Sequence, residues 1–275
     1  MKVAVLQMVS SASVAANLGV ARQLIGQAAD AGAELAVLPE YFCLLGLKDT
    51  DKLAIAEQAG LGPLQDFLSQ CASDFKLWVV GGTIPLATDP LGGISGKVYN
   101  STLVYNPAGQ CVARYDKIHL FRFDNGQESY DEARVLLPGA DSVAFDVPSR
   151  DGHRYRVGLS ICYDLRFPEL YRQLAADGAD LLLVPSAFTH TTGQAHWEVL
   201  LRARAIENLA YVLAAAQGGL HENQRRTWGH SMVVDPWGHI LAEQNQGPGV
   251  VLADIDKAKL AAHRAQLPAL DHRRL

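Results

Sequence analysis

The sequence lacks the features of a membrane protein and of a nucleic-acid-binding protein. No hydrophobic run approaches the roughly 18 residues that a membrane-spanning helix needs. The stretch 1–8 carries one positive charge and is too short for a signal peptide. There is no basic excess, since 24 Lys and Arg face 29 Asp and Glu, and the formal net charge is −5 at pH 7. Phosphate backbones are bound mainly through excess positive charge. We therefore expect a soluble cytoplasmic protein with no membrane or nucleic-acid partner.

Cysteine is scarce, and the common metal and nucleotide motifs are missing. The four cysteines lie far apart and include no CxxC pair, which argues against structural disulfides and a cysteine-built zinc site. No GxSxG, HExxH or phosphate-binding-loop motif occurs. No repeat, linker or low-complexity run divides the chain. We expect a single domain over residues 1–265, followed by a short tail, 266–275.

What the sequence does have is an alternation of short β-branched runs and amphipathic stretches, with 49% hydrophobic and 19% charged residues. This alternation is typical of an α/β protein. The segment 119–139 mixes charges, glycine and proline without periodicity, and its length suggests a functional loop. We expect strands at 2–7, 34–38, 77–84, 98–105, 110–116, 155–161, 180–185 and 210–216, a hairpin around 235–238, and helices at 17–31, 62–75, 168–176 and 197–208.

Cys162 is the candidate nucleophile. It follows the predicted strand 155–161 and precedes a helix that Pro168 can start, so we expect it on a sharp turn near a positive helix end. Such a setting favours a thiolate and an oxyanion. A free cysteine is more often a small buried hydrophobic residue, and Cys43, Cys71 and Cys111 keep that interpretation.

The candidate base is a carboxylate. A cysteine nucleophile usually borrows a histidine, but none of the nine histidines stands in an evident base position. Glu40 follows the predicted strand 34–38, and its apolar neighbours would suit it to general base catalysis. Lys117 follows the predicted strand 110–116, where its charge would stabilise an oxyanion. Taken singly, Glu40 also fits an ordinary loop carboxylate, and Lys117 a solvated lysine.

The three residues together, each at the end of a predicted strand, resemble the catalytic set of the nitrilase superfamily of carbon–nitrogen hydrolases. The matching stretches are LPEYF at 38–42, YDKIHLF at 115–121 and GLSICYDLRFPEL at 158–170. The likeness extends over nearly the whole chain. It implies a four-layer α-β-β-α sandwich that needs no metal or cofactor.

The resemblance also implies a role for each site residue. Cys162 is the expected nucleophile, Glu40 the general base, and Lys117 the side chain that stabilises the tetrahedral intermediate. Glu132, rather than Glu128, is the expected second glutamate that positions Lys117. The backbone N–H of Tyr163 would complete the oxyanion site.

A narrower resemblance concerns the substrate, a small amide. The stretches 187–208, 214–217 and 229–238 are similar to the deaminated glutathione amidase branch, whose members release 2-oxoglutarate and cysteinylglycine. Arg166 is a candidate clamp for a substrate carboxylate, or else a structural ion-pair partner of Glu169 or Asp164. The pocket is expected to be lined by three residues after a strand, for which loop packing is the alternative: Phe188, Thr189 and Thr192.

Other functions stay open at this point. The same catalytic residues suit an ω-amidase acting on 2-oxoglutaramate, or a hydrolase of N-carbamoyl amino acids. A nitrilase-shaped binding protein and a thiol-redox role for Cys162 are further alternatives. In the resembled family the helix after Cys162 and the helix at 197–208 form a dimer interface, so we expect at least a homodimer.

Overall fold

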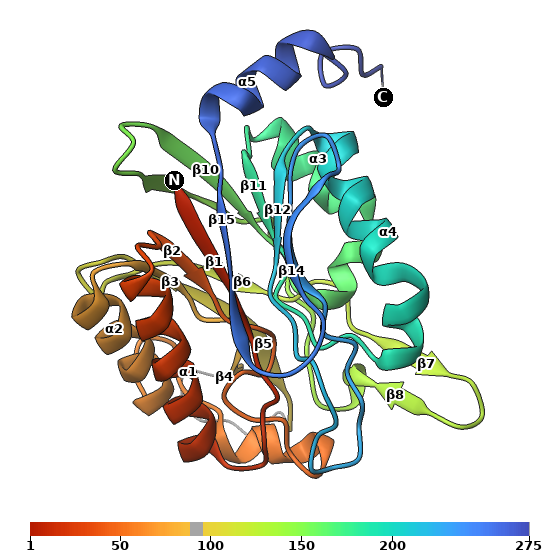
Figure 1. The fold of residues 1–275 in the computed structure, drawn as a ribbon. Helices are drawn as coiled ribbons and strands as arrows, with labels where there is room; N and C mark the ends of the chain where they lie inside the picture. The colour runs from red at the N-terminus through yellow and green to blue at the C-terminus, as the bar shows by residue number, and fades with distance from the viewer. Residues whose placement is uncertain (89–95, 275) are drawn as a thin grey trace.

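Two β-sheets pack face to face, and helices cover the outer face of each (Figure 1). The computed structural model describes residues 1–88 and 96–274. Helices α1 (Val14–Asp30) and α2 (Pro63–Phe75) cover the first sheet, and α3 (Pro168–Ala176) and α4 (His190–Asn208) cover the second. The predicted four-layer α-β-β-α sandwich is confirmed.

The first sheet has the order β15-β1-β2-β3-β5-β4, with β6 also paired to β5. Strands β1, β2 and β3 are parallel, and the other pairs are antiparallel. The strands are β1 (Lys2–Gln7), β2 (Leu35–Val37), β3 (Trp78–Val80), β4 (Ile84–Ala87), β5 (Val98–Tyr105), β6 (Cys111–Asp116) and β15 (Gly249–Asp254).

The second sheet has the order β14-β13-β12-β11-β10-β9, with β10, β11 and β12 parallel. After β15 the chain continues into α5 (Lys257–Gln266), which lies at one end of the sandwich (Figure 1). The strands are β9 (Ala144–Pro148), β10 (Arg154–Leu159), β11 (Leu181–Leu183), β12 (Tyr211–Ala214), β13 (Ser231–Val234) and β14 (Ile240–Gln244).

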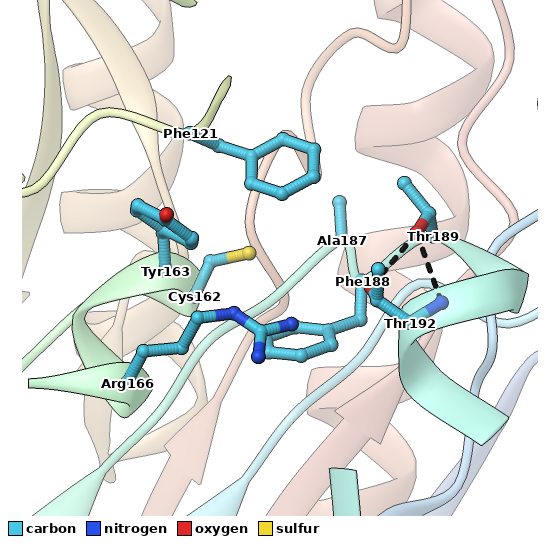
Figure 2. Close-up of a pocket in the computed structure, with 8 residues that line it drawn as sticks. All are labelled: Phe121, Cys162, Tyr163, Arg166, Ala187, Phe188, Thr189 and Thr192. Atoms are coloured by element: carbon cyan, nitrogen blue, oxygen red, sulfur yellow. Dashed lines mark hydrogen bonds between the residues drawn. The ribbon is translucent and has the colours of Figure 1, made fainter. Parts of the chain in front are cut away.

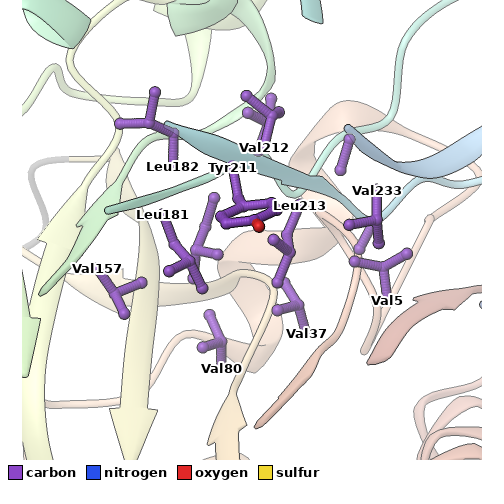
Figure 3. Packing of buried hydrophobic residues seen from close by; sticks show 14 of the residues in the cluster. Val5, Val37, Val80, Val157, Leu181, Leu182, Tyr211, Val212, Leu213 and Val233 are labelled. Carbon is purple, nitrogen blue, oxygen red and sulfur yellow. The ribbon is translucent and has the colours of Figure 1, made fainter. Parts of the chain in front are cut away.

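Aliphatic side chains fill the space between the sheets. Leu181 and Leu213 of the second sheet point toward Val37 and Val80 of the first, whereas Leu182 points to the opposite face (Figure 3). This alternation follows from the pleat, because successive residues of a strand face opposite sides. The central strands are therefore apolar at every position, as expected for strands buried on both faces.

The helices bury one apolar face each against the sheets. In α1 the buried side chains recur at helical spacing and include Leu24 and Ile25, which pack in the same cluster as Ala4 and Leu6 of β1. The helix begins where the Ser13 side chain accepts a hydrogen bond from the Ala16 N–H. Burial of each large aliphatic side chain contributes about 1.5–3 kcal/mol to stability.

The prediction of a single strand at 77–84 is wrong, because the segment contains β3 and the start of a second strand, β4. The chain turns at Gly82, whose φ is +47°, and a Cβ there would lie 2.0 Å from the Pro39 carbonyl oxygen. The backbone passes so close to the Pro39–Glu40 segment that the strand is interrupted. Thr83 then accepts a hydrogen bond from the Tyr41 N–H at 2.9 Å.

The segment 119–139 contains regular structure that its lack of periodicity hid. Strands β7 (Arg122–Asp124) and β8 (Ser129–Asp131) form a short hairpin that projects from the sandwich, followed by a 3₁₀ turn, Glu132–Arg134 (Figure 1). A two-stranded ribbon has no buried face, so no alternation of apolar residues marks it.

Helix α4 begins at His190, seven positions before the predicted start at 197. The Thr189 side chain caps it by accepting from the Thr192 N–H. Position 193 of the helix needs glycine because the helix packs closely against Trp228. A Cβ at this position would lie 2.2 Å from the Cβ of Trp228 and collide with it. Weak helix formers in the first turn hid the true start. The other predicted elements are present, with shorter strands at 34–38, 155–161, 180–185 and 210–216.

No helix within residues 1–88 and 96–274 combines the length and the apolar character needed to cross a membrane. The cytoplasmic location and the boundary between a 1–265 domain and a tail stay predictions.

Gly82→Ala is expected to lower the free energy of unfolding by about 3 kcal/mol, because the new methyl group collides with the Pro39 carbonyl and the left-handed backbone is strained. Gly32→Ala is the matched control, since its φ is +82° and nothing lies within 4 Å of the position that the new methyl group would take. It should cost only about 1–2 kcal/mol. Urea unfolding measures both, and equal losses would contradict the close-approach argument.

Candidate active site

The backbone turns sharply at Cys162, three residues after the end of β10. Cys162 has φ +49°, in the left-handed region that non-glycine residues rarely adopt. Its N–H donates to the Pro185 carbonyl at 3.0 Å, and the Asp164 carboxylate accepts from the Ile161 N–H at 2.8 Å. These bonds stabilise the turn and a 3₁₀ segment, Cys162–Arg166, which precedes the helix that begins at Pro168 as predicted. The structure has the sharp turn, and Cys162 is 7% exposed.

Glu40, Lys117 and Glu132 meet in a buried cluster beside the thiol. The Lys117 ammonium has no solvent exposure and lies 2.9 Å from Glu40 Oε1 and 2.8 Å from Glu132 Oε2. Lys117 directly follows β6, and Glu40 comes three residues after β2, so strands of one sheet deliver both. Buried charges in proteins are paired in this way because an isolated one is too costly.

Further hydrogen bonds hold the two carboxylates. Asn100 Nδ2 donates to Glu40 Oε1 at 2.8 Å, and the Ala187 N–H donates to Glu40 Oε2 at 2.9 Å. Tyr41 Oη donates to Glu132 Oε1 at 2.9 Å, and the Phe121 N–H donates to Glu132 Oε2 at 2.7 Å. Each carboxylate is thus fixed by at least two donors besides the lysine.

Electrostatics keep Lys117 and Glu132 charged and the Cys162 thiol neutral. Burial alone would lower the pKa of Lys117, but Glu132 and Glu40 raise it well above its ordinary value. Burial opposes ionisation of Glu132, yet the nearby Lys117 charge and its hydrogen bond lower the pKa of that carboxyl. Burial, followed by the Glu40 charge, raises the pKa of the Cys162 thiol well above its ordinary value, against the influence of Lys117. A base must therefore remove the thiol proton before Cys162 can attack a substrate.

The sequence argument separated the two glutamates of the 119–139 segment as the structure does. Glu132 contacts Lys117, whereas Glu128 is bonded to Tyr130 Oη and Thr191 Oγ1 outside the cluster. The residues at the cluster that sequence reasoning missed are Asn100 and Tyr41. Tyr41 adjoins Glu40 in the first motif, which was a usable signal, but nothing local marks Asn100.

A pocket opens over the thiol, and all the expected substrate-binding residues line it (Figure 2). The Cys162 sulfur points into the space between the rings of Phe121 and Phe188. The lining residues are Phe121, Cys162, Tyr163, Arg166, Ala187, Phe188, Thr189 and Thr192. Thr189 and Thr192 hydrogen-bond each other through their hydroxyl groups at 2.8 Å.

Arg166 is held by aromatic rings and a histidine. Its guanidinium carbon lies 5.4 Å from the Phe188 ring centroid and 5.8 Å from that of Tyr163, and Nη1 lies 3.2 Å from His196 Nδ1. Within the described part of the chain it pairs with no carboxylate. The expected alternative, an ion pair with Asp164 or Glu169, is wrong, because the Asp164 carboxylate is taken by other donors. Its guanidinium charge is therefore free for a ligand in the pocket.

Among the described residues, no group of three or more His, Cys, Asp or Glu side chains is arranged to hold a metal ion.

Lys117→Met is expected to lower the free energy of unfolding by about 3–5 kcal/mol at pH 7.5, because it leaves buried carboxylates unpaired. Without the lysine, burial and mutual repulsion would raise the carboxyl pKa values in the folded state above those of the unfolded chain. The loss should therefore shrink as the pH falls toward 5, since the carboxylates then protonate.

Denaturant unfolding of both proteins at pH 7.5 and pH 5 tests this. The matched control is Lys117→Met with Glu132→Gln, which removes one unpaired charge and should recover part of the stability. A stability difference independent of pH would contradict the charge argument.

Comparison with known proteins agrees with this geometry. Residues 2–265 match the sequence model of the family described as carbon-nitrogen hydrolase. A relative from Synechocystis sp. named deaminated glutathione amidase is 43% identical over 98% of this chain and 97% of its own length. A human relative named omega-amidase NIT2 is 38% identical over 99% of this chain and 95% of its own length.

Solved structures share the fold. Saccharomyces cerevisiae Nit3, described as a member of the nitrilase superfamily, has a TM-score of 0.86 and 33% identity, covering 100% of this chain and 97% of that one. An amidase from Nesterenkonia sp. AN1, with acrylamide added at its active-site cysteine, has a TM-score of 0.78 and 26% identity, covering 98% of each chain. The chain therefore belongs to the carbon–nitrogen hydrolase family of the nitrilase superfamily, as the three motifs predict, and it is a hydrolase of carbon–nitrogen bonds.

Proposed function

We propose that this amide hydrolase cleaves deaminated glutathione to 2-oxoglutarate and cysteinylglycine through a thioester on Cys162. The observation that carries the proposal is the buried cluster of Glu40, Lys117 and Glu132 beside a neutral thiol. Arg166, which pairs with no carboxylate of the described residues, lines the pocket over that thiol. A base, an oxyanion donor and a carboxylate clamp then surround one nucleophile.

Glu40 is the general base. Its Oε1 accepts from both Lys117 and Asn100, whereas the one hydrogen bond to Oε2 from the described residues comes from the Ala187 N–H. A carboxylate oxygen has two lone pairs, so Oε2 retains one that can take the thiol proton. The proton moves from the Cys162 sulfur to Oε2 as the sulfur attacks the amide carbonyl carbon.

Lys117 and the backbone N–H of Tyr163 stabilise the oxyanion. Tyr163 lies in the first turn of the 3₁₀ segment Cys162–Arg166, where backbone N–H groups lack a partner within the helix and can donate to a ligand. A preorganised donor of this kind contributes about 3–4 kcal/mol to the transition state. Glu132, which is bonded to Lys117, positions the ammonium group.

The carbon–nitrogen bond then breaks, and Glu40 returns its proton to the departing amine. The acyl group remains on Cys162 as a thioester. Glu40 next removes a proton from a water molecule, whose oxygen attacks the thioester carbonyl. The carbon–sulfur bond breaks, the thiolate regains a proton, and the acid product leaves.

The substrate assignment rests on charge and on the relatives. Arg166 lies at the pocket wall, and its guanidinium group pairs with no carboxylate of the described residues. It could therefore form a bidentate bond to the carboxylate of the 2-oxo acid part of the substrate. Phe188, Thr189 and Thr192 would contact the acyl chain between that carboxylate and the scissile amide. A relative that is 43% identical over nearly the full chain bears the name deaminated glutathione amidase.

The second candidate is ω-amidase activity on 2-oxoglutaramate. It is favoured by the human relative named omega-amidase, and its substrate has the same acyl group. A binding protein without turnover is disfavoured because base, nucleophile and cation are all present in one buried cluster.

We also propose that the protein forms a homodimer through α4. Val199 and Ile206, two turns apart on this helix, are 69% and 46% exposed. Trp237, which adjoins the Gly238 that packs near Ile206, is 44% exposed. Large apolar side chains gathered on one face of a helix are typical of an interface.

The decisive measurement is 2-oxoglutarate release from deaminated glutathione, with 2-oxoglutaramate assayed in parallel. Cys162→Ala and Glu40→Gln are each expected to lower kcat by about 10,000-fold or more, because the nucleophile or its base is lost. Mass spectrometry of the stopped reaction should detect the acyl group on Cys162 of the wild type. Retention of activity by either purified variant would refute the mechanism, and turnover of the small amide alone would refute the substrate.

The dimer is tested by light scattering with wild type and Val199→Glu. The wild type is expected to show about twice the chain mass, and the variant a smaller mass, because a charge cannot be buried unpaired in an apolar interface. A monomeric mass for the wild type would refute the interface.

A further inference from the structure

We infer that Lys52 and Arg225 bind the carboxylate at the leaving-group end of the substrate, and so select deaminated glutathione over smaller amides. The inference rests on the proposed function. It assigns a second anion site, separate from Arg166, to a hollow beside the catalytic cluster.

The hollow is lined by two cations from distant parts of the chain. Lys52 comes from the 3₁₀ segment Asp49–Ile55, and Arg225 from the loop between β12 and β13. Lys52 Nζ lies 4.5 Å from the ring centroid of Tyr41, and Arg225 Cζ lies 4.6 Å from that of Tyr130. The lining residues are Tyr41, Asp49, Lys52, Phe121, Tyr130, Asp131, Glu132, Val135 and Arg225.

The positive charge of this hollow is only partly neutralised by the carboxylates that line it, Asp49, Asp131 and Glu132. Among the described residues, Lys52 has no carboxylate within 4 Å, and the nearest one to Arg225 is the exposed Asp49 at 3.7 Å. Asp131 is 3.7 Å from Arg134, and Glu132 is taken by Lys117. Burial lowers the pKa of Lys52, and the charges of Glu132 and Asp49 only partly oppose this effect. A carboxylate in the hollow would supply the missing partner.

The hollow also lies close to the reacting atoms. Phe121 lines both this hollow and the pocket over Cys162. Tyr41, whose ring faces Lys52, hydrogen-bonds the same Glu132 oxygen that Lys117 Nζ contacts. A chain of contacts through Tyr41 and Glu132 thus connects Lys52 to Lys117, the group that would stabilise the oxyanion.

The leaving group carries the charge that this hollow would bind. Cysteinylglycine is a dipeptide, and two extended residues span roughly 7 Å. Its terminal carboxylate would therefore extend past Phe121 while the scissile carbonyl stays at Cys162. In 2-oxoglutaramate the leaving group is ammonia, which carries no carboxylate and cannot use the second site.

The alternative is that Lys52 only supports Tyr41, and through it Glu132. A positioning role of that kind predicts the same proportional loss for every substrate, because Glu132 acts on Lys117 in each case. Selective loss with one substrate is the readout that separates the two roles.

The experiment compares deaminated glutathione with its C-terminal glycinamide and with 2-oxoglutaramate. For Lys52→Met we expect the kcat/KM ratio of deaminated glutathione to its glycinamide to fall about 10- to 100-fold, chiefly through KM. Lys52→Arg keeps the charge and should retain most of the preference. Lys76→Met, an exposed lysine at the end of α2, is the matched control and should leave the ratio at the wild-type value.

Each outcome decides a different question. If the wild type does not hydrolyse deaminated glutathione, the proposed substrate is wrong, and this inference with it. A wild type that prefers deaminated glutathione, together with variants whose losses are equal for all three substrates, would overturn the second site alone. Arg225→Met is measured in the same way, so the test stands even where Lys52→Met does not fold, and an unchanged ratio would overturn the inference.

Discussion

A protonated lysine without solvent exposure constrains the whole active site. Removing an ammonium ion from water costs several kcal/mol, and the cost is offset only where anions and hydrogen bonds surround it closely. Lys117 has two such anions, Glu40 and Glu132, each of which is fixed by donors from other segments. The surplus negative charge, together with burial, keeps the neighbouring Cys162 thiol protonated at rest. The same charges that hold the lysine thus make Glu40 the base on which attack depends.

The fold supplies these groups from elements far apart in the chain. Glu40 and Lys117 follow strands of one sheet, whereas Cys162 and Ala187 follow strands of the other. The two sheets pack through apolar side chains, so the position of the base relative to the nucleophile depends on core packing between the layers. The close approach at Gly82 shows how little freedom the Glu40 segment has, since even a methyl group does not fit there. A rigid frame of this kind suits a reaction whose catalytic groups must be held in position beforehand.

Sequence patterns predicted the α/β class and many of the elements, whereas the four layers were implied by the family resemblance. Periodicity found helix α1 and the buried strands because burial imposes a regular spacing of apolar residues. It missed the break after β3, where two backbone segments pass close together, and the exposed β7–β8 hairpin. Neither feature imposes a regular spacing of apolar residues. Asn100 was missed for a related reason. It lies within an ordinary strand, and only the pairing of sheets and loops brings it to Glu40.

The sequence by itself determined which catalytic groups the protein has and that each of them lies just beyond the end of a strand. Glu40, Lys117 and Cys162 each come at most three residues after a strand, and that local pattern is encoded by neighbouring residues. Only the tertiary structure decided that Asn100 reaches Glu40, that Arg166 lies against aromatic rings, and that Lys52 lies over the ring of Tyr41. These are relations between segments separated by tens of residues. Distance, burial and charge balance arise only when the chain is packed, and no local pattern records them.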